Sequence, residues 1–574
     1  MSGTREFLEA RDFLLTVQNY EEAKRDFKWP RLKEFNWALD YFDIMAEERT
    51  DPAVIFVDDE GAEEKLSFQR LRERSNQVAN FLKSIGLGKG DRILLLLPNR
   101  IELFEVFLGA MKVGCPIIPA STLLMSGDIE DRIIRGKIKC VISDRQLAER
   151  VEQAGGAEKL LKSKIIVEDL LEGWLSYSET GAFSSAFTSD QRFFPEDELL
   201  IYFTSGTTAK PKLVLHTHSS YPVGHLTTMY WIGLKPGDLH YNISAPGWAK
   251  HAWSTIFAAW NAEATTFVYG YAGKFDPKKT LEKIEEYEIQ TLCAPPTVWR
   301  LLLLENLKKY NFALREVVSA GEPLNPEIIE RVKEDTGITI REGYGQTETT
   351  LQIGTFPGVE VKAGSMGVEA PGFNIAIIDY DNHKLAPEGK EGAIAIKVKP
   401  ERPVGLMTHY IDPREKNLEV FVEDWYLTGD LAIKDKNGYF WFIGRVDDVF
   451  KSSDYRIGPF EIESELLTHN LVAESAVVAS PDELRGFVPK AFITLKPSFS
   501  PSRKNALELF KFIRSRMAPY KRPRIIEFTP ELPKTVSGKI RRTELRNYET
   551  ELRSKKTRAS NEYFEGDFAQ ELKM

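Results

Sequence analysis

The stretch ILLLLPNRIELFEVFLGAMKVGCPIIPA, residues 93–120, carries the pattern that indicates the fold class. Residues 93–98 are an apolar run typical of a buried strand, residues 101–114 have the periodicity of a helix, and residues 115–120 predict the next strand. Similar runs follow at 199–203, 265–270, 277–287, 291–296 and 315–323. Helices between buried strands predict an α/β fold, with parallel sheets covered on both faces.

A chain of 574 residues is too long for one ordinary hydrophobic core, and its pattern changes twice. After about residue 365, short apolar runs separated by Asp-Asn and Pro-Glu-Gly turns predict a smaller β-rich subdomain. From Asp447 on, expected helices at 459–469 and 503–516 alternate with strands, which predicts a compact α+β module. We therefore expect an N-terminal domain over residues 1–446 with two parallel-type α/β sheets and the β-rich subdomain, then a small C-terminal domain over residues 447–550. Residues 551–574 form a polar tail that we expect to be frayed or lightly docked.

Composition and charge narrow the class of protein. The net charge of −9 argues against non-specific nucleic-acid binding, which needs a basic surface. The three cysteines and eight histidines form no metal-binding motif, and the two histidines nearest a candidate loop, His216 and His218, read as polar strand residues. No run approaches the roughly 20 apolar residues of a membrane span, and the first residues lack the apolar segment of a signal peptide. A cytoplasmic location is the resulting expectation.

The loop TSGTTAKPK, residues 204–212, follows the apolar strand LLIYF directly. Hydroxyl groups, a glycine and two lysines within nine positions offer backbone N–H groups, hydroxyl donors and positive charge to a polyphosphate. The spacing is not that of a Walker A loop. A polar hairpin turn explains the loop about equally well when it is considered alone.

Five further motifs lie downstream: AGEPLNPE (320–327), REGYGQTET (341–349), WYLTGDLA (425–432), GYFWFIGRVDDVFKSSDYRIGPFEIE (438–463) and LPKTVSGKIRR (532–542). Together with the 204–212 loop, they resemble in order and spacing the motifs of the adenylate-forming superfamily, and most closely its medium-chain acyl-CoA synthetase branch. The resemblance covers about residues 50 to 545. It implies an ATP-dependent acyl-CoA synthetase, an AMP-forming acid–thiol ligase that uses ATP, Mg²⁺ and coenzyme A.

The resemblance also implies a nucleotide site. Thr347 is placed to hydrogen-bond the α-phosphate, Glu348 matches the family's Mg²⁺ ligand, and Asp430 matches the ribose ligand, with Arg445 nearby. A single carboxylate combined with phosphate and water oxygens suits Mg²⁺. The full set of expected ATP-binding residues is Thr204, Ser205, Gly206, Thr207, Thr208, Lys210, Lys212, Gly321, Glu322, Pro323, Glu342, Gly343, Tyr344, Gly345, Gln346, Thr347, Asp430, Arg445 and Lys539.

The C-terminal motifs imply a mobile lid domain. Lys539 matches the family's adenylation lysine and joins Thr347 and Glu348 as a catalytic candidate, and Asp447 matches the hinge about which the lid rotates between the half-reactions. The expected CoA contacts are Ser453, Asp454, Tyr455, Arg456, Arg485, Arg514 and Lys521. Asp454 departs from the family, which usually has glycine there, and adds a side chain and a negative charge beside an anionic cofactor.

The acid pocket is expected to be lined by Trp248, Lys250, Trp253 and Gly345. Acetate-specific relatives have a tryptophan where Gly345 stands, so glycine is expected to leave depth for a medium-chain or branched aliphatic acid. Lys250 and Trp253 are placed to narrow that space again.

Three other functions remain open at this point. A ligase that loads the phosphopantetheine arm of a separate carrier protein would have the same motifs. A luciferase-type oxygenase shares the fold, but no motif marks oxygen chemistry. A nucleotide-binding regulator without catalysis is disfavoured by the intact Thr347, Glu348, Asp430 and Lys539.

Overall fold

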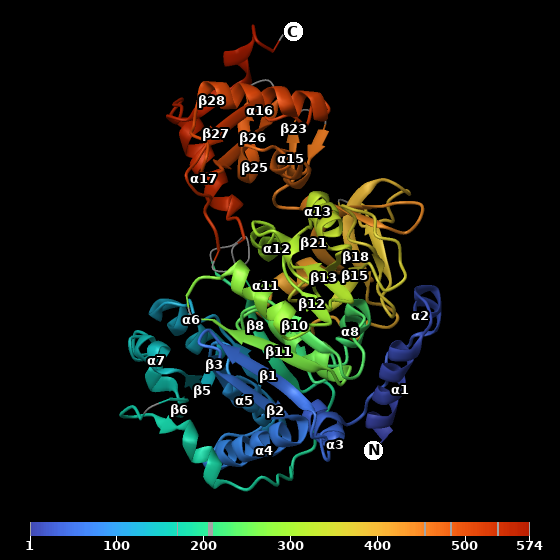
Figure 1. Ribbon diagram of the computed structural model, residues 1–574, viewed down its shortest axis with the longest axis vertical. Helices are drawn as coiled ribbons and strands as arrows, with labels where there is room; N and C mark the ends of the chain where they lie inside the picture. The colour runs from blue at the N-terminus through green and yellow to red at the C-terminus, as the bar shows by residue number, and fades with distance from the viewer. Residues whose placement is uncertain are drawn as a thin grey trace. The chain divides into compact units, whose positions relative to one another are not determined.

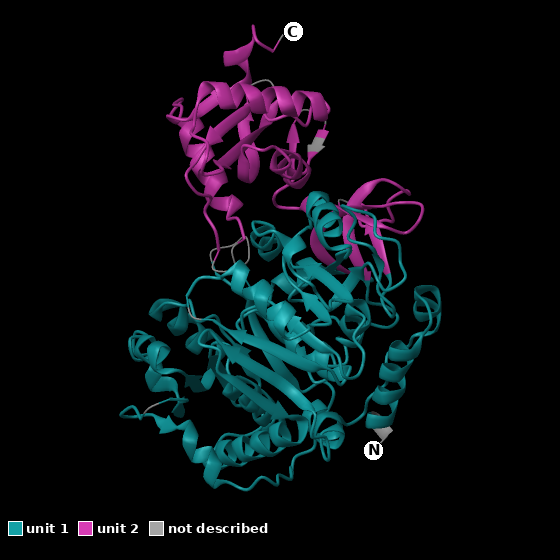
Figure 2. Cartoon of the chain, viewed as in Figure 1, with its two compact units in different colours: residues 1–374, 397–425 teal, residues 375–396, 426–574 magenta. Residues whose placement is uncertain are grey.

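The structure, a computed structural model, describes residues 2–168, 170–204, 210–271, 273–380, 382–452, 455–482, 485–535 and 539–572. It divides into two compact units (Figure 2). The first comprises Met1–Asn374 and Lys397–Trp425, and the second comprises Ile375–Ile396 and Tyr426–Met574.

The first unit contains a nine-stranded sheet in the order β16-β15-β14-β13-β12-β10-β11-β1-β2 (Figure 1). The six strands from β14 to β1 pair in parallel, whereas β2, β15 and β16 are antiparallel to their neighbours. Their bounds are β1 (Pro52–Asp58), β2 (Glu63–Ser67), β10 (Leu239–Asn242), β11 (Thr265–Gly270), β12 (Thr291–Cys293), β13 (Glu316–Ala320), β14 (Arg341–Gly345), β15 (Leu351–Gly354) and β16 (Val368–Glu369).

An eight-stranded sheet in the same unit has the order β19-β9-β8-β4-β3-β5-β6-β7. Six strands of this sheet pair in parallel with their neighbours, in the order β8, β4, β3, β5, β6 and β7. Strand β9 is antiparallel to β8. The bounds are β3 (Arg92–Leu96), β4 (Ile117–Pro119), β5 (Ile138–Ser143), β6 (Ser163–Ile166), β7 (Leu175–Ser176), β8 (Glu198–Thr204), β9 (Lys212–Thr217) and β19 (His409–Asp412). Two largely parallel sheets confirm the α/β prediction.

Helices connect these strands and begin at residues that suit helix N-termini. Before α11 the Asp276 side chain accepts from the Lys279 N–H, and before α13 Asn325 accepts from Glu327, each followed by proline at the first helical position. The principal helices of the unit are α1 (Ser2–Thr16), α2 (Tyr20–Asp26), α4 (Phe68–Ser84), α5 (Ile101–Val113), α6 (Ser126–Gly136), α7 (Arg145–Glu152), α8 (Leu226–Ile232), α9 (Ala249–His251), η4 (Ala252–Ala258), α11 (Pro277–Glu286), α12 (Pro296–Leu302), α13 (Pro326–Thr336) and α14 (Lys416–Val420). Among the described helices, none combines the length and apolar character needed to cross a membrane.

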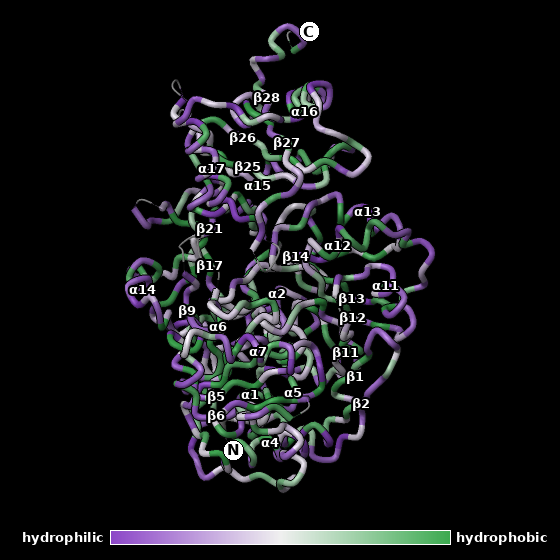
Figure 3. The backbone as a smooth tube through the Cα atoms, turned by 90° about the vertical axis from the view of Figure 1, so that its left-hand side faces the viewer, coloured by the Kyte–Doolittle hydropathy of each residue, from purple (hydrophilic) through white to green (hydrophobic). Residues whose placement is uncertain are grey.

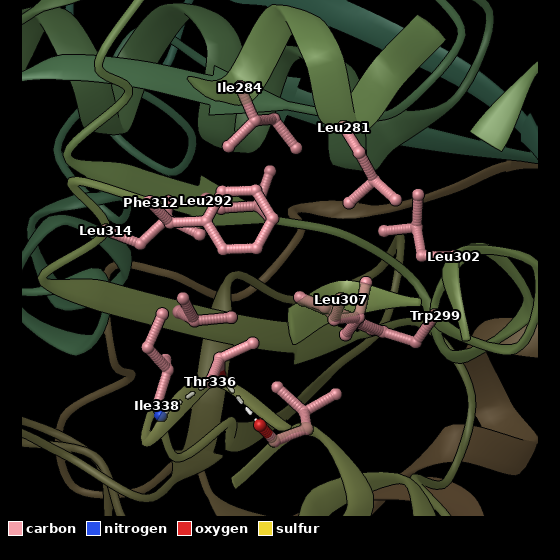
Figure 4. A pocket seen from close by; sticks show the side chains of 12 residues that line it. Leu281, Ile284, Leu292, Trp299, Leu302, Leu307, Phe312, Leu314, Thr336 and Ile338 are labelled. Carbon is pink, nitrogen blue, oxygen red and sulfur yellow. Dashed lines mark hydrogen bonds between the residues drawn. The ribbon is translucent and has the colours of Figure 1, made fainter. Parts of the chain in front are cut away.

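The core of the first unit lies between its sheets and helices, and its strands are rich in hydrophobic residues (Figure 3). One small cavity of about 10 Å³ remains between α11, α12, α13 and the nine-stranded sheet (Figure 4). Its lining is apolar except for Thr336, whose hydroxyl donates to the Val332 carbonyl. A space of this size holds one water molecule at most, so it is a packing gap and not a substrate site.

The second unit begins with the β-rich subdomain predicted from the turn signals. Strand β18 (Glu391–Lys397) lies between β17 (Ile375–Ile378) and β21 (Trp425–Lys434), and β22 (Phe440–Arg445) pairs with β21. The remainder is an α+β module with a four-stranded sheet in the order β25-β26-β27-β28. Its elements are β23 (Phe450–Ser452), β24 (Tyr455–Ile457), α15 (Pro459–Leu467), β25 (Val472–Asp482), β26 (Gly486–Leu495), α16 (Arg503–Arg516), β27 (Ile525–Phe528), α17 (Arg542–Ser554) and β28 (Glu562–Phe564).

The expectation of a frayed or lightly docked tail over residues 551–574 is wrong for the part that the structure describes, up to residue 572. Strand β28 pairs with β27, and Phe568 is fully buried in the core of the α+β module. Glu562 of β28 joins an ion-pair cluster in which the buried Lys490 ammonium lies 2.7 Å from Glu527 and also contacts Glu549 and Glu562. Polar composition misled the prediction because these tail charges are paired inside the fold.

Candidate active site

The phosphate-loop candidate lies at the end of the β8–β9 hairpin. Thr204 ends β8 and pairs in register with Lys212, which begins β9. The Thr204 hydroxyl is buried and has no hydrogen-bond partner among the described residues, whereas Lys210 is exposed. The expected loop residues Ser205, Gly206, Thr207 and Thr208 lie outside the described residues.

Lys212, Glu348 and Tyr410 form a compact cluster at this hairpin. The Lys212 ammonium lies 3.1 Å from Glu348 Oε1 and 3.0 Å from the Tyr410 hydroxyl, and that hydroxyl donates to Glu348 Oε1 over 2.6 Å. Burial alone would raise the pKa of Glu348, but the charge of Lys212 and the two hydrogen bonds hold it below the ordinary carboxyl value. Glu348 is therefore a buried carboxylate that carries its negative charge.

Backbone contacts fix the turn that presents this carboxylate. Met407 N–H donates to the Glu348 carbonyl over 2.7 Å, and Nε2 of His216 lies 2.7 Å from the Thr347 carbonyl. The prediction of polar strand residues near the loop is confirmed for His216, which lies in β9, whereas His218 follows the end of that strand. Both are fully buried, and burial lowers the pKa of each to about 4. A neutral His216 thus holds Thr347 in place through its ring N–H.

Sequence reasoning missed Tyr410 and the supporting role of His216. Tyr410 lies in the segment MTHYID, which has no turn or motif signal. Tyr410 reaches the site only because β19 pairs with β9. This pairing brings Tyr410 into contact with Lys212, which lies almost 200 positions earlier in the chain.

The expected adenine-side residues lie directly after β13 and within β14, neighbouring strands whose carboxyl ends meet at one edge of the sheet. Gly321 has a φ of +110°, a left-handed conformation that favours glycine. Glu322, next to Pro323, accepts from the Thr297 hydroxyl over 2.9 Å. Tyr344 is half-buried at the end of β14.

Two other residues of this motif, Glu342 and Gly343, are buried in the packing beneath the expected adenine site. Burial raises the pKa of Glu342 to about 8, although its Oε1 accepts from the Leu324 N–H. A Cβ on Gly343 would lie 2.3 Å from the Trp231 ring, so only glycine fits there. Gln346 N–H donates to the Thr349 hydroxyl and forms part of the turn that leads to Glu348.

The acid-pocket candidates come from α9, η4 and β14. Trp248 and Lys250 are half-buried, and Trp253 is 5% exposed. Trp253 packs directly against Gly345, at the point where the acid pocket is expected. A Cβ at Gly345 would lie 2.5 Å from the Trp253 ring and 2.5 Å from the Thr350 carbonyl oxygen, so Trp253 already occupies the space.

The second unit holds the remaining nucleotide candidates. Asp430 and Arg445 face each other on β21 and β22 with 3.2 Å between Oδ1 and Nε, and the Asp430 side chain is 5% exposed. Lys539 is exposed, and its backbone lies against Thr535. There the Thr535 N–H donates to the Lys539 carbonyl and the Lys539 N–H donates to the Thr535 hydroxyl.

Among the CoA-site candidates, Ser453 and Asp454 lie outside the described residues. Tyr455 stacks on Tyr520 with ring centroids 4.2 Å apart, and Arg456 lies in β24. Two expected phosphate contacts already carry counter-charges: Arg514 lies 3.0 Å from Glu565, and Lys521 lies 2.6 Å from Glu461.

Arg485 is exposed, with its N–H bonded to Asp482. The hinge candidate Asp447 is exposed in the turn between β22 and β23.

The donor set at Glu348 fits Mg²⁺. Its Oε1 is shared by Lys212 and Tyr410, but an ionised carboxylate has about four acceptor positions, so capacity for a cation remains. A single protein carboxylate supplemented by phosphate and water oxygens is a common arrangement for this hard cation.

Comparison with known proteins gives consistent matches over nearly the whole chain. The family model "AMP-binding enzyme" matches residues 43–410, and "AMP-binding enzyme C-terminal domain" matches residues 461–539. Acyl-coenzyme A synthetase ACSM3, mitochondrial, of Rattus norvegicus is 42% identical over 92% of this chain and 93% of its own length. 4-hydroxybutyrate–CoA ligase 1 of Metallosphaera sedula is 44% identical over 93% of this chain and 94% of its own.

Solved structures agree with these matches. The anthranilate CoA ligase AuaEII in complex with anthranoyl-AMP superposes with a TM-score of 0.84 at 28% identity, covering 91% of this chain and 99% of that one. A benzoate CoA ligase from Burkholderia xenovorans gives a TM-score of 0.78 at 29% identity, over 89% and 100% of the two chains.

Proposed function

Because this chain belongs to the AMP-binding enzyme family and is an AMP-forming acid–thiol ligase, we propose roles for its residues in making acyl-CoA from ATP, CoA and a carboxylic acid. The observation that carries the assignment is the buried cluster of Lys212, Glu348 and Tyr410 at the β8–β9 hairpin. It places a fixed positive charge and an ionised carboxylate beside Thr347, at the end of a loop rich in hydroxyl groups.

The first half-reaction joins two anions, so its barrier falls when their charges are neutralised and their geometry is fixed. A carboxylate oxygen of the acid attacks the α-phosphorus of ATP, and the bond to pyrophosphate breaks. We assign Lys212 and the 204–210 loop to the β- and γ-phosphates and Thr347 to the α-phosphate. Glu348 would hold Mg²⁺, which supplies neutralising charge to the phosphate oxygens when it is bound.

The other nucleotide contacts follow from the types of side chain present. Asp430 accepts from both ribose hydroxyls, and its pairing with Arg445 orients the carboxylate. Tyr344 offers a half-buried aromatic face to the adenine next to Gly321, Glu322 and Pro323. Lys539 stabilises the charge that develops at the α-phosphate.

In the second half-reaction the CoA sulfur attacks the acyl carbon, the bond to AMP breaks and the thiol proton leaves to solvent. We keep Tyr455, Arg456 and Arg485 as CoA contacts, together with Ser453 and Asp454. Arg514 and Lys521 would have to exchange a carboxylate partner for phosphate. The C-terminal domain boundary at residue 447 and the hinge role of Asp447 stand as proposals with them.

For the acid we propose a short aliphatic chain, because Trp253 fills the space beside Gly345. The proposed range of acids is therefore shorter than the medium-chain or branched aliphatic acids that the motifs favour. The name of the Metallosphaera relative, a 4-hydroxybutyrate–CoA ligase, supports a short chain.

The three cysteines are free and buried, which supports a reducing compartment such as the cytoplasm, while the rat relative is named mitochondrial. Cell fractionation with an antibody to the chain distinguishes the two compartments.

A substrate panel tests the proposal. Acids with two to eight carbons are supplied to ATP–pyrophosphate exchange, and each active acid is then assayed for thioester formation with CoA. We expect exchange and thioester with the same short acids. Exchange without thioester would instead indicate transfer to a carrier-protein thiol.

A further inference from the structure

The amine group of Lys250 is a buried donor whose nearest acceptor is the weakly accepting Cys293 thiol. Its Nζ atom is out of contact with water and has no hydrogen-bond partner among the described residues, although part of its stem is exposed. The backbone is held in place, since Asn242 Nδ2 donates to the Lys250 carbonyl over 3.1 Å. A buried donor left unpaired is costly, and a charged one more so, which indicates that the group meets a ligand.

The surroundings of this ammonium do not satisfy it. Burial lowers the pKa of Lys250, and the nearby Cys293 and Glu322 oppose that shift only in part. The Cys293 thiol is a weak acceptor, and the Glu322 carboxylate already accepts from Thr297. In both its protonated and its neutral form, the Lys250 amine therefore has N–H groups available as hydrogen-bond donors.

Two neighbouring polar atoms are in the same condition. Trp253 lies three residues beyond Lys250, and its Nε1 is buried without a partner among the described residues. Oδ1 of Asn242 is likewise buried and unpaired within the described chain, while its Nδ2 holds the Lys250 carbonyl. Three buried polar atoms on residues 242–253, two donors and one acceptor, thus lack a hydrogen-bond partner among the described residues.

From these contacts, and resting on the acid site proposed above, we propose that the substrate is a short hydroxy acid whose hydroxyl oxygen accepts a hydrogen bond from Lys250. A methyl group would leave all three polar atoms unpaired. A second carboxylate would serve the donors but would bring negative charge toward Asn242 Oδ1 and the Glu322 side. A hydroxyl both accepts and donates, so it matches a wall that offers both kinds of atom. Trp253, packed against Gly345, limits the chain to a few carbons.

Matched acids test this on the full-length protein with ATP and CoA. Each hydroxy acid is compared with the acid in which a methyl group replaces the hydroxyl: 3-hydroxypropanoate with butanoate, and 4-hydroxybutanoate with pentanoate. We expect one hydroxy acid to be preferred over its partner in kcat/KM by roughly 10–100-fold, the range of a charge-assisted hydrogen bond. Preference for the methyl acid in both pairs would overturn the proposal.

Variants at Lys250 assign the preference to this residue. Lys250→Met keeps the length of the side chain without its donors, and we expect the ratio of hydroxy to methyl acid to fall by roughly 10–100-fold. Lys250→Gln retains an N–H donor and should keep part of the preference, and Lys274→Met, at an exposed lysine, should leave the ratio unchanged.

An unchanged ratio in Lys250→Met would contradict the assignment. AMP release with the methyl acids shows that the ligase itself works. If no acid gave AMP release, that result would contradict the proposed function and, with it, this inference.

Discussion

Replacing Glu348 by glutamine removes the charge of a buried carboxylate and leaves its shape. The Lys212 ammonium, 3.1 Å from Glu348 Oε1, loses its counter-charge in a site where the two side chains are 15% and 9% exposed. At an effective dielectric constant of about 20, the Coulomb energy across that distance is about 5 kcal/mol. Breaking a buried pair by removing one partner costs about 3–5 kcal/mol, so we expect a lower apparent melting temperature.

The functional effect is separated from this loss by two companion variants. Lys212→Met with Glu348→Gln removes both charges, so stability should largely return. Tyr410→Phe keeps the carboxylate and loses one hydrogen bond to it, which costs about 1.5–3 kcal/mol.

ATP–pyrophosphate exchange is measured for each variant as a function of Mg²⁺ concentration. We expect Glu348→Gln to lose about 10²–10³-fold in rate and to need more Mg²⁺. The double variant should regain stability but stay slow, and Tyr410→Phe should keep most of its Mg²⁺ response. Recovery of exchange together with stability in the double variant would refute a role for this cluster in binding Mg²⁺ and ATP, and would leave it a purely structural ion pair.

Four further substitutions test other proposed residues. Lys539→Ala should slow formation of the acyl-adenylate by about 10²–10³-fold while largely sparing CoA transfer from supplied acyl-adenylate, and equal damage to both half-reactions would contradict its assignment. Glu342→Gln should abolish a pH dependence of stability. The carboxyl pKa rises from 4.5 to about 8 on folding, so its stabilising neutral form is fully present below pH 4.5 and is lost as pH rises through 8. At about 1.4 kcal/mol per pKa unit, the destabilisation of the wild type amounts to at most about 5 kcal/mol. Melting curves of the ligand-free protein should therefore show the variant more stable than the wild type by about 1 kcal/mol at pH 5.5 and by about 4–5 kcal/mol at pH 8.5. Trp253→Ala should extend activity to acids of six to eight carbons, whereas Gly345→Trp should weaken binding of all acids; an unchanged chain-length profile in Trp253→Ala would argue against this pocket.

Local signals were sufficient for much of the fold. The helix predicted over residues 101–114 is α5, Ile101–Val113, and the helix predicted over residues 277–287 is α11, Pro277–Glu286. Both have strong periodicity and clear end signals, which do not depend on distant parts of the chain. The motif resemblance to the adenylate-forming superfamily is confirmed by the family models and the relatives.

Contacts between distant segments were not predictable from these signals. Tyr410 reaches Lys212 only through the pairing of β19 with β9, and Trp253 meets Gly345 only where η4 packs against the end of β14. A glycine in a motif shows that a side chain is absent, but it does not show what fills the space. The ordered tail depends likewise on Lys490, which pairs with Glu562 from 72 positions away.

The route through an acyl-adenylate is tested most directly by the fate of the acid's own oxygen. An acid that the protein accepts is labelled with oxygen-18 in both carboxylate positions and supplied with ATP and CoA, and the products are analysed by mass spectrometry. Attack of the carboxylate on the α-phosphorus followed by thiol displacement leaves one labelled oxygen on each AMP released. We expect AMP to carry one labelled oxygen for each acyl-CoA formed, with unlabelled pyrophosphate. Unlabelled AMP, or labelled inorganic phosphate together with ADP, would contradict adenylation.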